Sequence, residues 1–293
     1  MSPSISTTIG LSSRSHSAQS AGAGAQGGLL VVAQGDGGHG TGWLSARVVI
    51  HALCACFETC TAPAHFIGAA GESYDRKSCL GQSFPDALRI AQAACKQTLG
   101  GHAATSSDLP DLFMALDRIL QTLLREQAGI PASLGASSLA AVIEGSRIRG
   151  AHAGAGLVLL LRAGAREPEV LAKPHFLEEV LRRTGNSQGI DLTLIPPDIT
   201  ASALGLLSHS TIGVDGFDVD LSPGDLLLLC SSPLAVHHTD LTMLLRNALD
   251  QGASIEPIAR EIERADLCAS ENDGYFGRTV AFALAFLNPN PTQ

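Results

Sequence analysis

Three short apolar stretches in the middle of the chain, joined by tight turns, constrain the fold most strongly. They cover residues 138–143, 147–153 and 157–162. The turns between them are Glu144-Gly145-Ser146 and Gly154-Ala155-Gly156, and their glycines suit hairpin connections. Connections this short join antiparallel neighbours, because a parallel pair of strands needs a long crossover. This region therefore predicts an antiparallel meander.

Apolar periodicity elsewhere predicts more strands and pairs of helices. A strand over 29–33 leads through the glycine-rich loop Gly35-Asp36-Gly37-Gly38-His39-Gly40 into a helix over 43–60. Asp108 is expected to cap the helix over 109–126, with Pro110 in its first turn. The other predicted helices cover 84–99, 176–183, 239–249 and 255–267, and the other predicted strands cover 217–221, 226–230 and 279–287.

No linker divides this pattern, and no internal repeat is visible. The prediction is one α+β domain over residues 8–288, in which two sheets pack face to face with helices outside. Residues 1–7 are expected to form a flexible N-terminus and residues 289–293 a C-terminal tail. Residues 61–83 have no clear periodicity and are expected to be irregular.

The composition excludes several classes of function. Hydrophobic residues make up 45% of the chain and charged residues 16%, as in a globular protein. A formal net charge of −9 argues against a nucleic-acid partner, which binds to a basic surface. No apolar run approaches the roughly 18 residues of a membrane span. Residues 1–28 lack the apolar core of a secretion signal, so a cytoplasmic location is expected.

The seven cysteines favour reduced thiols in a reducing compartment, because they are odd in number and lie in apolar segments. Cys54, Cys56 and Cys60 resemble a metal-binding cluster in spacing. They lie in a predicted helix, however, where the first two side chains point in different directions. They are interpreted as buried structural thiols, and a metal or redox role is the alternative.

The ordered motifs resemble bacterial members of the metal-dependent protein phosphatase family, type 2C (PPM-type). Residues 32–39, Val-Ala-Gln-Gly-Asp-Gly-Gly-His, match the family's Val-Ala-Asp-Gly-x-Gly-Gly-His. Residues 223–234 match its Pro-Gly-Asp-x-x-x-Leu-Cys-Ser-Asp-Gly-Leu run. Further landmarks fall on Gly135-Ala136-Ser137, Gly154-Ala155-Gly156-Leu157, Leu204-Gly205 and Phe276-Gly277-Arg278-Thr279. The resemblance covers about residues 8–288 and implies the family's β-sandwich, two central antiparallel sheets flanked by helix pairs.

In this family, aspartates at the sheet edge hold two Mg²⁺ or Mn²⁺ ions that activate a water for attack on phosphoserine or phosphothreonine. The resemblance places the metal-ligand positions on residues without a carboxylate: Gln19, Gln34, Gly35, Ala155, Ser232 and Phe276. Hard cations need several anionic oxygens, so the resemblance implies no metal, no other cofactor and no intact catalytic residue. Arg14 matches the arginine that grips phosphate in the family, and a solvated arginine is the alternative interpretation.

The predicted function is therefore that of a pseudophosphatase, a degenerate member that serves as a regulatory binding module. Its expected partner is a protein, either a phosphoprotein or a substrate of a Ser/Thr kinase, recognised through the vacated cleft and residues 61–83. The alternative is an active Mg²⁺- or Mn²⁺-dependent protein serine/threonine phosphatase with a rearranged metal site. Its candidate ligands are Asp36 and Asp273, and Asp266 and Glu271 lie in the same region as Asp273.

Two other features suggest a binding site but also fit an ordinary structural role. The glycine-rich loop lies between a strand and a helix, where it is suited to cradle a phosphate, but it lacks the Lys-Ser/Thr pair of a P-loop. His237 and His238 lie near Asp240, but adjacent side chains diverge on a helix or a strand. We interpret this pair as a solvated helix start.

Overall fold

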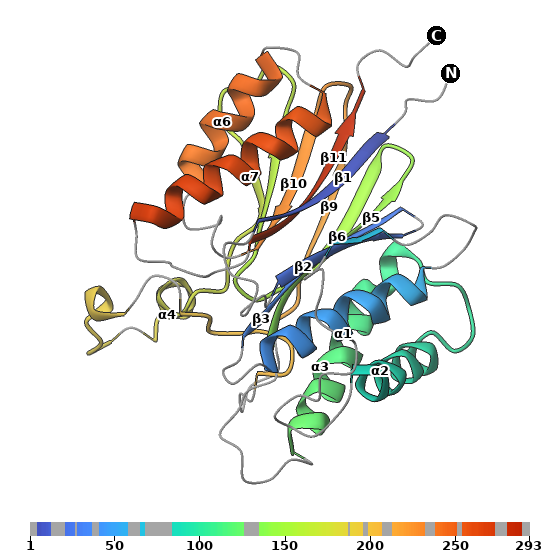
Figure 1. Ribbon diagram of the computed structural model, residues 1–293. Coiled ribbons are helices and arrows are strands. Elements are labelled where there is room, and N and C mark those ends of the chain that lie inside the picture. Colours follow the sequence, from blue (N-terminus) through green and yellow to red (C-terminus); the bar gives the residue numbers. More distant parts are fainter. Residues whose placement is uncertain are drawn as a thin grey trace.

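The apolar stretches form two antiparallel sheets that pack face to face, with helices on the outer side of each (Figure 1). One sheet has the strand order β1-β11-β10-β7-β8, and the other has the order β4-β2-β3-β5-β6-β9. This computed structural model describes residues 5–12, 21–26, 28–36, 41–57, 65–67, 84–125, 135–186, 188–195, 199–206, 213–231, 238–250, 254–272 and 280–288.

The five-stranded sheet joins the two ends of the chain. Ile5 at the start of the first strand pairs with Leu287 at the end of the last, and the remaining pairs are antiparallel as well. Its strands are β1 (Ile5–Ser12), β11 (Val280–Leu287), β10 (Leu226–Cys230), β7 (Leu157–Leu161) and β8 (Glu169–Ala172).

The six-stranded sheet contains only the first two strands of the predicted meander, because the third, over 157–161, pairs within the five-stranded sheet. Glu144-Gly145-Ser146 forms their turn, with Gly145 at a φ of +68°. The strands are β4 (His65–Ile67), β2 (Ala21–Gln26), β3 (Leu29–Asp36), β5 (Gly135–Glu144), β6 (Arg147–Ala153) and β9 (Asp215–Asp220).

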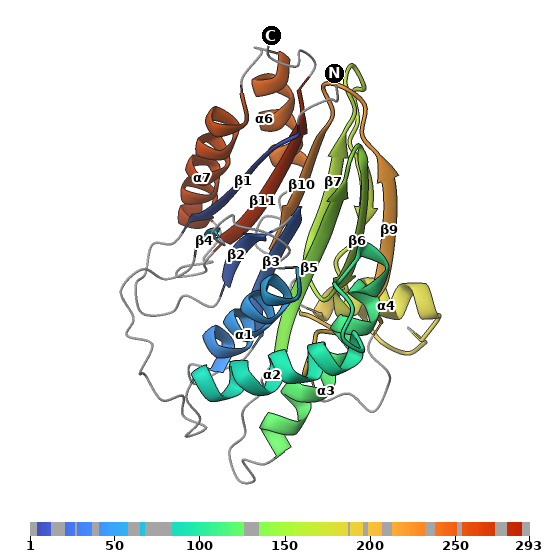
Figure 2. The same cartoon turned by 90° about the vertical axis from the view of Figure 1, so that its right-hand side faces the viewer.

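Two groups of helices cover the sheets, and one short helix projects from them (Figure 1, Figure 2). The six-stranded sheet is covered by α1 (Thr41–Cys56), α2 (Phe84–Thr98) and α3 (Leu109–Arg125). The five-stranded sheet is covered by α6 (His238–Asp250) and α7 (Ile255–Asn272). The projecting helix is α4 (Leu177–Thr184), and single 3₁₀ turns occur at Ser106–Asp108 and Leu192–Leu194.

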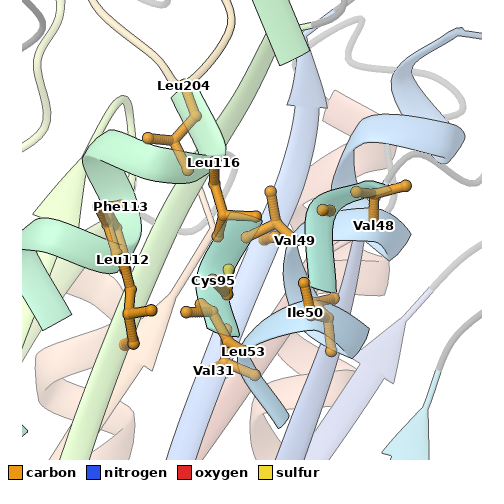
Figure 3. Close-up of a cluster of buried hydrophobic side chains, with 14 of the residues drawn as sticks. Val31, Val48, Val49, Ile50, Leu53, Cys95, Leu112, Phe113, Leu116 and Leu204 are labelled. Atoms are coloured by element: carbon orange, nitrogen blue, oxygen red, sulfur yellow. The ribbon is translucent and has the colours of Figure 1, made fainter. Parts of the chain in front are cut away.

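Central strands contain unbroken apolar runs because both of their faces are buried there. In β3, Leu30 and Val32 face the core between the sheets, and Leu29 and Val31 face the core beneath the helices. Successive side chains of a strand point to opposite faces, so an unbroken apolar run fills two cores at once. Figure 3 shows the helix side of this arrangement, where the labelled side chains include Val31, Val49, Leu53, Cys95, Leu112, Leu116 and Leu204.

The predicted architecture is confirmed, and several strands without a continuous apolar run were missed. The strands over 147–153 and 226–230 have the predicted bounds. Strand β1 contradicts the expected flexible N-terminus at residues 5–7, which pair with β11. Its polar composition hid it, because only Ile5 and Ile9 among its described side chains pack on the inter-sheet core. Strands β2 and β8 were missed as well, since they are short and rich in small or polar residues.

Two local predictions need correction. Asp108 ends a 3₁₀ turn, and its carboxylate accepts hydrogen bonds from the backbone N–H of Thr105 at 2.8 Å and from the Thr105 hydroxyl at 2.7 Å. It therefore precedes α3 without capping it, whereas Pro110 does lie in the first turn of α3 as predicted. Within the region expected to be irregular, the described residues 65–67 form β4, which pairs Ile67 with Ala23.

None of the helices within the described residues is long and apolar enough to cross a membrane.

Candidate functional site

Three of the predicted ligand positions lie together where β3, β5 and β6 meet. Gln34 of β3 pairs with Ser137 of β5, and Gly35 pairs with Ala136. After β6, the chain turns so that the backbone N–H of Ala155 donates to the Ser137 Oγ at 3.0 Å. We call Gln34, Gly35, Ser137 and Ala155 the strand-end cluster. Ser137, which the sequence marked only as a landmark, joins the other positions.

The turn after β6 has no room for larger residues. Gly154 has a φ of +109°, and a Cβ there would lie 2.5 Å from the Ser137 Oγ and 2.6 Å from its Cα. A Cβ at Gly156 would lie 2.5 Å from the Leu139 Cδ1. Ala155 between them is fully buried. Close packing therefore fixes the backbone at the position where the family carries Gly-Asp-Ser-Arg.

A buried carboxylate supports this region from the helix side. Ala136 forms an isolated bridge with Leu204, and the next residue, Gly205, donates its backbone N–H to Asp117 Oδ1 at 2.8 Å. Gln121 donates to the other carboxylate oxygen at 3.0 Å. Burial raises the pKa of Asp117, although the hydrogen bond from Gly205 acts in the opposite direction. The Leu204-Gly205 landmark is thus bound to α3.

The described side chains of the strand-end cluster do not fit a hard divalent cation. Gln34 offers a neutral amide and Ser137 a neutral hydroxyl, and Gly35 and Ala155 offer no side-chain donor. Mg²⁺ and Mn²⁺ favour sets of oxygens that include carboxylates. The position of Ala155 is also fully buried, where an ion without anionic ligands is strongly disfavoured.

The other predicted site residues cannot be placed in the same way. Asp36 is the last residue of β3, and its backbone pairs with Gly135, but its side chain lies outside the described part of the chain. Helix α7 extends to Asn272, five residues beyond its predicted end, so Asp266 and Glu271 belong to it. The positions outside the described residues are Arg14, Gln19, Ser232, Asp273 and Phe276. Residues 37–40 of the glycine-rich loop and the side chains of His237, His238 and Asp240 are outside them as well.

A second cluster, which the sequence analysis missed, lies on the other side of Gly154. One donor atom each from His152, His175 and Asp215 lies within 4.8 Å of the other two. His152 belongs to β6, His175 precedes α4 and Asp215 begins β9. Because 40 residues separate His175 from Asp215, no motif spacing could have revealed this histidine cluster.

Hydrogen bonds define the proton positions in the histidine cluster. His152 Nε2 lies 2.8 Å from the Gly154 carbonyl oxygen, so this nitrogen carries the proton and donates. The Gly154 N–H donates to His175 Nδ1 at 3.2 Å, so His175 is protonated at Nε2 and donates to Asp215 Oδ2 at 2.9 Å. The two imidazole rings are 4.4 Å apart between centroids.

Burial sets the charge of the cluster. Desolvation, reinforced by the neighbouring His175, lowers the pKa of His152 to about 3, so its ring is neutral at pH 7. Burial opposes ionisation of Asp215, but its hydrogen bond from His175 and the Arg183 guanidinium outweigh that effect and lower its pKa. Arg183 Nη1 lies 3.7 Å from Asp215 Oδ2. A neutral His152 ring and an ionised Asp215 carboxylate therefore lie on either side of His175.

The described cysteines match their interpretation as reduced thiols, most of them buried. Cys54, Cys95 and Cys230 are buried and Cys56 is half-buried, and none of these four forms a disulfide. Burial raises the pKa of the Cys230 thiol to about 12, which keeps it protonated and unreactive. Cys60 lies outside the described residues.

Comparison with known proteins identifies the fold. No protein-family model matches this sequence, and no curated protein matches it. Among solved structures, a serine/threonine phosphatase from S. agalactiae is 16% identical, with a TM-score of 0.63 over 97% of this chain and 100% of that one. Stp1 from Staphylococcus aureus is 17% identical, with a TM-score of 0.62 over 98% and 97% of the two chains. The catalytic domain of PstP in complex with two manganese ions is 18% identical, with a TM-score of 0.60 over 97% and 100%. At these identities the comparison establishes the fold, which is that of the type 2C phosphatases.

Proposed function

We propose that this chain is a catalytically degenerate type 2C phosphatase-like protein, a pseudophosphatase that acts as a regulatory module by binding a protein partner. The proposed partner is a phosphoprotein or a substrate of a Ser/Thr kinase. The observation that carries the proposal is the strand-end cluster, in which Gln34, Gly35 and Ala155 occupy the positions matched to metal ligands. The frame of the site is kept, and its described side chains are neutral.

The charge balance of the phosphatase reaction supports this proposal. When two hard cations are bound, they supply the activated water and neutralise the phosphate. A cation at this edge would need anionic oxygens to offset its dehydration, whereas Gln34 contributes one neutral amide and Ala155 contributes none. The chain's own residues would then bind and orient a partner without cleaving it.

The decisive experiment measures metal binding and turnover together. The purified chain is titrated with Mn²⁺ by calorimetry and incubated with a phosphothreonine peptide and excess Mn²⁺, beside an active phosphatase of this fold as positive control. We expect no saturable Mn²⁺ binding in the micromolar range and no phosphate release above a heat-denatured sample. Phosphate release by the wild type would reject the proposal.

The alternative activity has its own variants. If the chain hydrolyses the peptide, Asp36→Ala and Asp273→Ala will show whether either carboxylate rebuilds the metal site. Asp36 is worth testing first, because it directly follows Gly35 in β3. Loss of hydrolysis in Asp36→Ala alone would establish the alternative, an active metal-dependent phosphatase with a rearranged site.

Binding without turnover is measured separately by fluorescence anisotropy. A labelled phosphothreonine peptide is compared with the same peptide without phosphate, using the wild type and Arg14→Ala. A phosphoprotein partner predicts tighter binding of the phosphorylated peptide and a weaker preference in the variant. Equal affinity for the two peptides would show that the chain does not recognise the phosphate, and only binding to the protein part of the partner would remain.

A further inference from the structure

We propose that His152, His175 and Asp215 form a binding site for one transition-metal ion of borderline hardness, such as Zn²⁺, at the base of the segment between His175 and Asp215. This inference does not depend on the proposed function. Two imidazoles and one carboxylate are a donor set that Zn²⁺ favours, with a water completing four-coordination.

The donors already lie close to the arrangement that such an ion requires. Their separations are all within 4.8 Å, and His175 Nε2 lies 2.9 Å from Asp215 Oδ2. Zinc–nitrogen and zinc–oxygen bonds of about 2.0–2.2 Å place tetrahedral ligands roughly 3.4 Å apart. The widest pair would have to approach by roughly 1.5 Å, which side-chain rotations can supply.

His152 supplies an independent observation that points to a ligand. Its ring is fully buried, and its Nδ1 has no hydrogen-bond partner among the described residues. The Gly154 carbonyl oxygen holds the proton on Nε2, so the unpartnered Nδ1 carries the lone pair. Histidine ligands of metals commonly donate their other N–H to a backbone carbonyl in this way. A bound ion would satisfy an acceptor that is otherwise left unpaired.

His175 has to change its hydrogen bonds when the ion binds. Its Nε2 proton, now donated to Asp215, has to leave that nitrogen before it can ligate the metal. A neutral ring then takes its proton on Nδ1, so the Gly154 N–H has to turn away. That bond, at 3.2 Å, is at the long end of the usual range. We therefore expect a weaker affinity than that of a preformed structural zinc site.

Asp215 gives the ion access from solvent. Its side chain is 48% exposed, so ions and the completing water can reach the carboxylate. The competing cation is Arg183, whose side chain is 60% exposed and free to turn into water. Because His175 and Asp215 begin and end the segment that contains α4, a bound ion would clamp both ends of this segment to β6.

The test uses the full chain, stripped of metal with a chelator and titrated with Zn²⁺ by calorimetry. Co²⁺ serves as a spectroscopic probe, because its d–d absorption reports tetrahedral nitrogen and oxygen ligands. We expect Asp215→Asn to weaken Zn²⁺ binding at least tenfold and His175→Gln to abolish it. His102→Ala is the matched control, since His102 also lies beside a carboxylate, with its Nε2 3.3 Å from Asp108 Oδ1, but joins no three-residue cluster of metal-ligand side chains among the described residues.

The outcomes separate this site from other zinc sites. Both ligand variants should retain the circular-dichroism spectrum of the wild type. If His175→Gln does not fold, Asp215→Asn still tests the site, because it keeps the shape of a half-exposed side chain. Absence of Zn²⁺ binding by the wild type at millimolar Zn²⁺ would overturn the proposal. Wild-type affinity in Asp215→Asn would overturn it as well, as would Co²⁺ absorption dominated by thiolate ligands. Gln34→Ala changes only the strand-end cluster, so this variant should bind Zn²⁺ like the wild type. Zn²⁺ binding at the histidine cluster and Mn²⁺ binding at the strand-end cluster are therefore tested separately.

Discussion

The two clusters on either side of Gly154 are held in place by different means. In the strand-end cluster, backbone pairing and close packing position Gln34 and Ala155, and the described side chains are neutral. In the histidine cluster, side-chain hydrogen bonds join His175 to Asp215 across 40 residues of sequence. Gly154 serves both, because its N–H and C=O bond the two histidines while its Cα lies against Ser137.

Under the proposed function, this difference explains how a catalytic site would lose its chemistry while the strands that carry it are kept. Where the main chain positions a site, a ligand residue can change to Gln or Ala without disturbing the strands that carry it. Where side chains position a site, replacing one of them releases the elements it joins. The strand-end cluster belongs to the first kind, and the histidine cluster to the second.

The largest effect is expected when Gly154, the glycine that both clusters share, is replaced. Gly154→Ala forces a residue with a Cβ to a φ of +109° and places that Cβ 2.6 Å from the Ser137 Cα. Strain and overpacking together should lower the free energy of unfolding by about 3–5 kcal/mol. Urea denaturation measures this change.

Gly101→Ala is the control for that substitution. Gly101 has a φ of +91°, and a Cβ added there would have nothing within 4 Å. The Gly101→Ala variant therefore has the backbone strain of Gly154→Ala without the steric clash. We expect it to lower stability by about 1–2 kcal/mol. Equal losses in the two variants would show that close packing at Gly154 contributes nothing.

The second substitution adds charge to the strand-end cluster. Ala155→Asp places a carboxylate at a fully buried position and should destabilise the chain by about 2–4 kcal/mol without metal, and Ala155→Asn by less. In the double variant Gln34→Asp/Ala155→Asp, Mn²⁺ should raise the melting temperature. The wild type should show no such shift, and an equal shift in both proteins would mean that the natural site binds Mn²⁺.

The smallest effect is expected at the support behind the strand-end cluster. Asp117→Ala leaves the buried N–H of Gly205 without its acceptor, which should cost about 1–3 kcal/mol, whereas Asp117→Asn keeps an acceptor oxygen. Burial raises the pKa of Asp117 above its unfolded value, so the folded state gains a proton first as the pH falls. The wild type should therefore gain stability relative to Asp117→Asn as the pH falls through that raised pKa. Parallel stability profiles from pH 7 to pH 4 would contradict this.

The sheet architecture could be predicted because a strand buried on both faces has an unbroken run of apolar residues. Residues 226–230 are apolar throughout, since alternate side chains enter the inter-sheet core and the core beneath α6 and α7. Edge strands bury fewer side chains, so their apolar pattern is weaker. β8 was missed because only Ala172 of its four residues is buried, and β1 because few of its described side chains enter a core.

The sequence marked the site positions that lie at the ends of apolar strands, but it gave no signal for the residues of the histidine cluster. Gln34 and Ala155 each lie at the end of an apolar strand that aligns with a motif, so the sequence marks both positions, and the structure brings them to the same strand ends. His152, His175 and Asp215 come from three separate elements, and their meeting depends on how the segment containing α4 folds back onto β6. Hydrogen bonds across such distances have no periodic signature in a sequence.

The pairing of β1 with β11 has a consequence for the synthesis of this protein. Ile5 pairs with Leu287, and Asn288 donates to the Ser6 hydroxyl across 282 residues of sequence. A ribosome makes residues 5–12 long before residues 280–288, so the first strand has to wait for the intervening chain before its neighbour exists. Contacts this distant in sequence also slow folding, because the intervening chain must be ordered before they can form. The five-stranded sheet is therefore completed only after the chain between its first and last strands has been made.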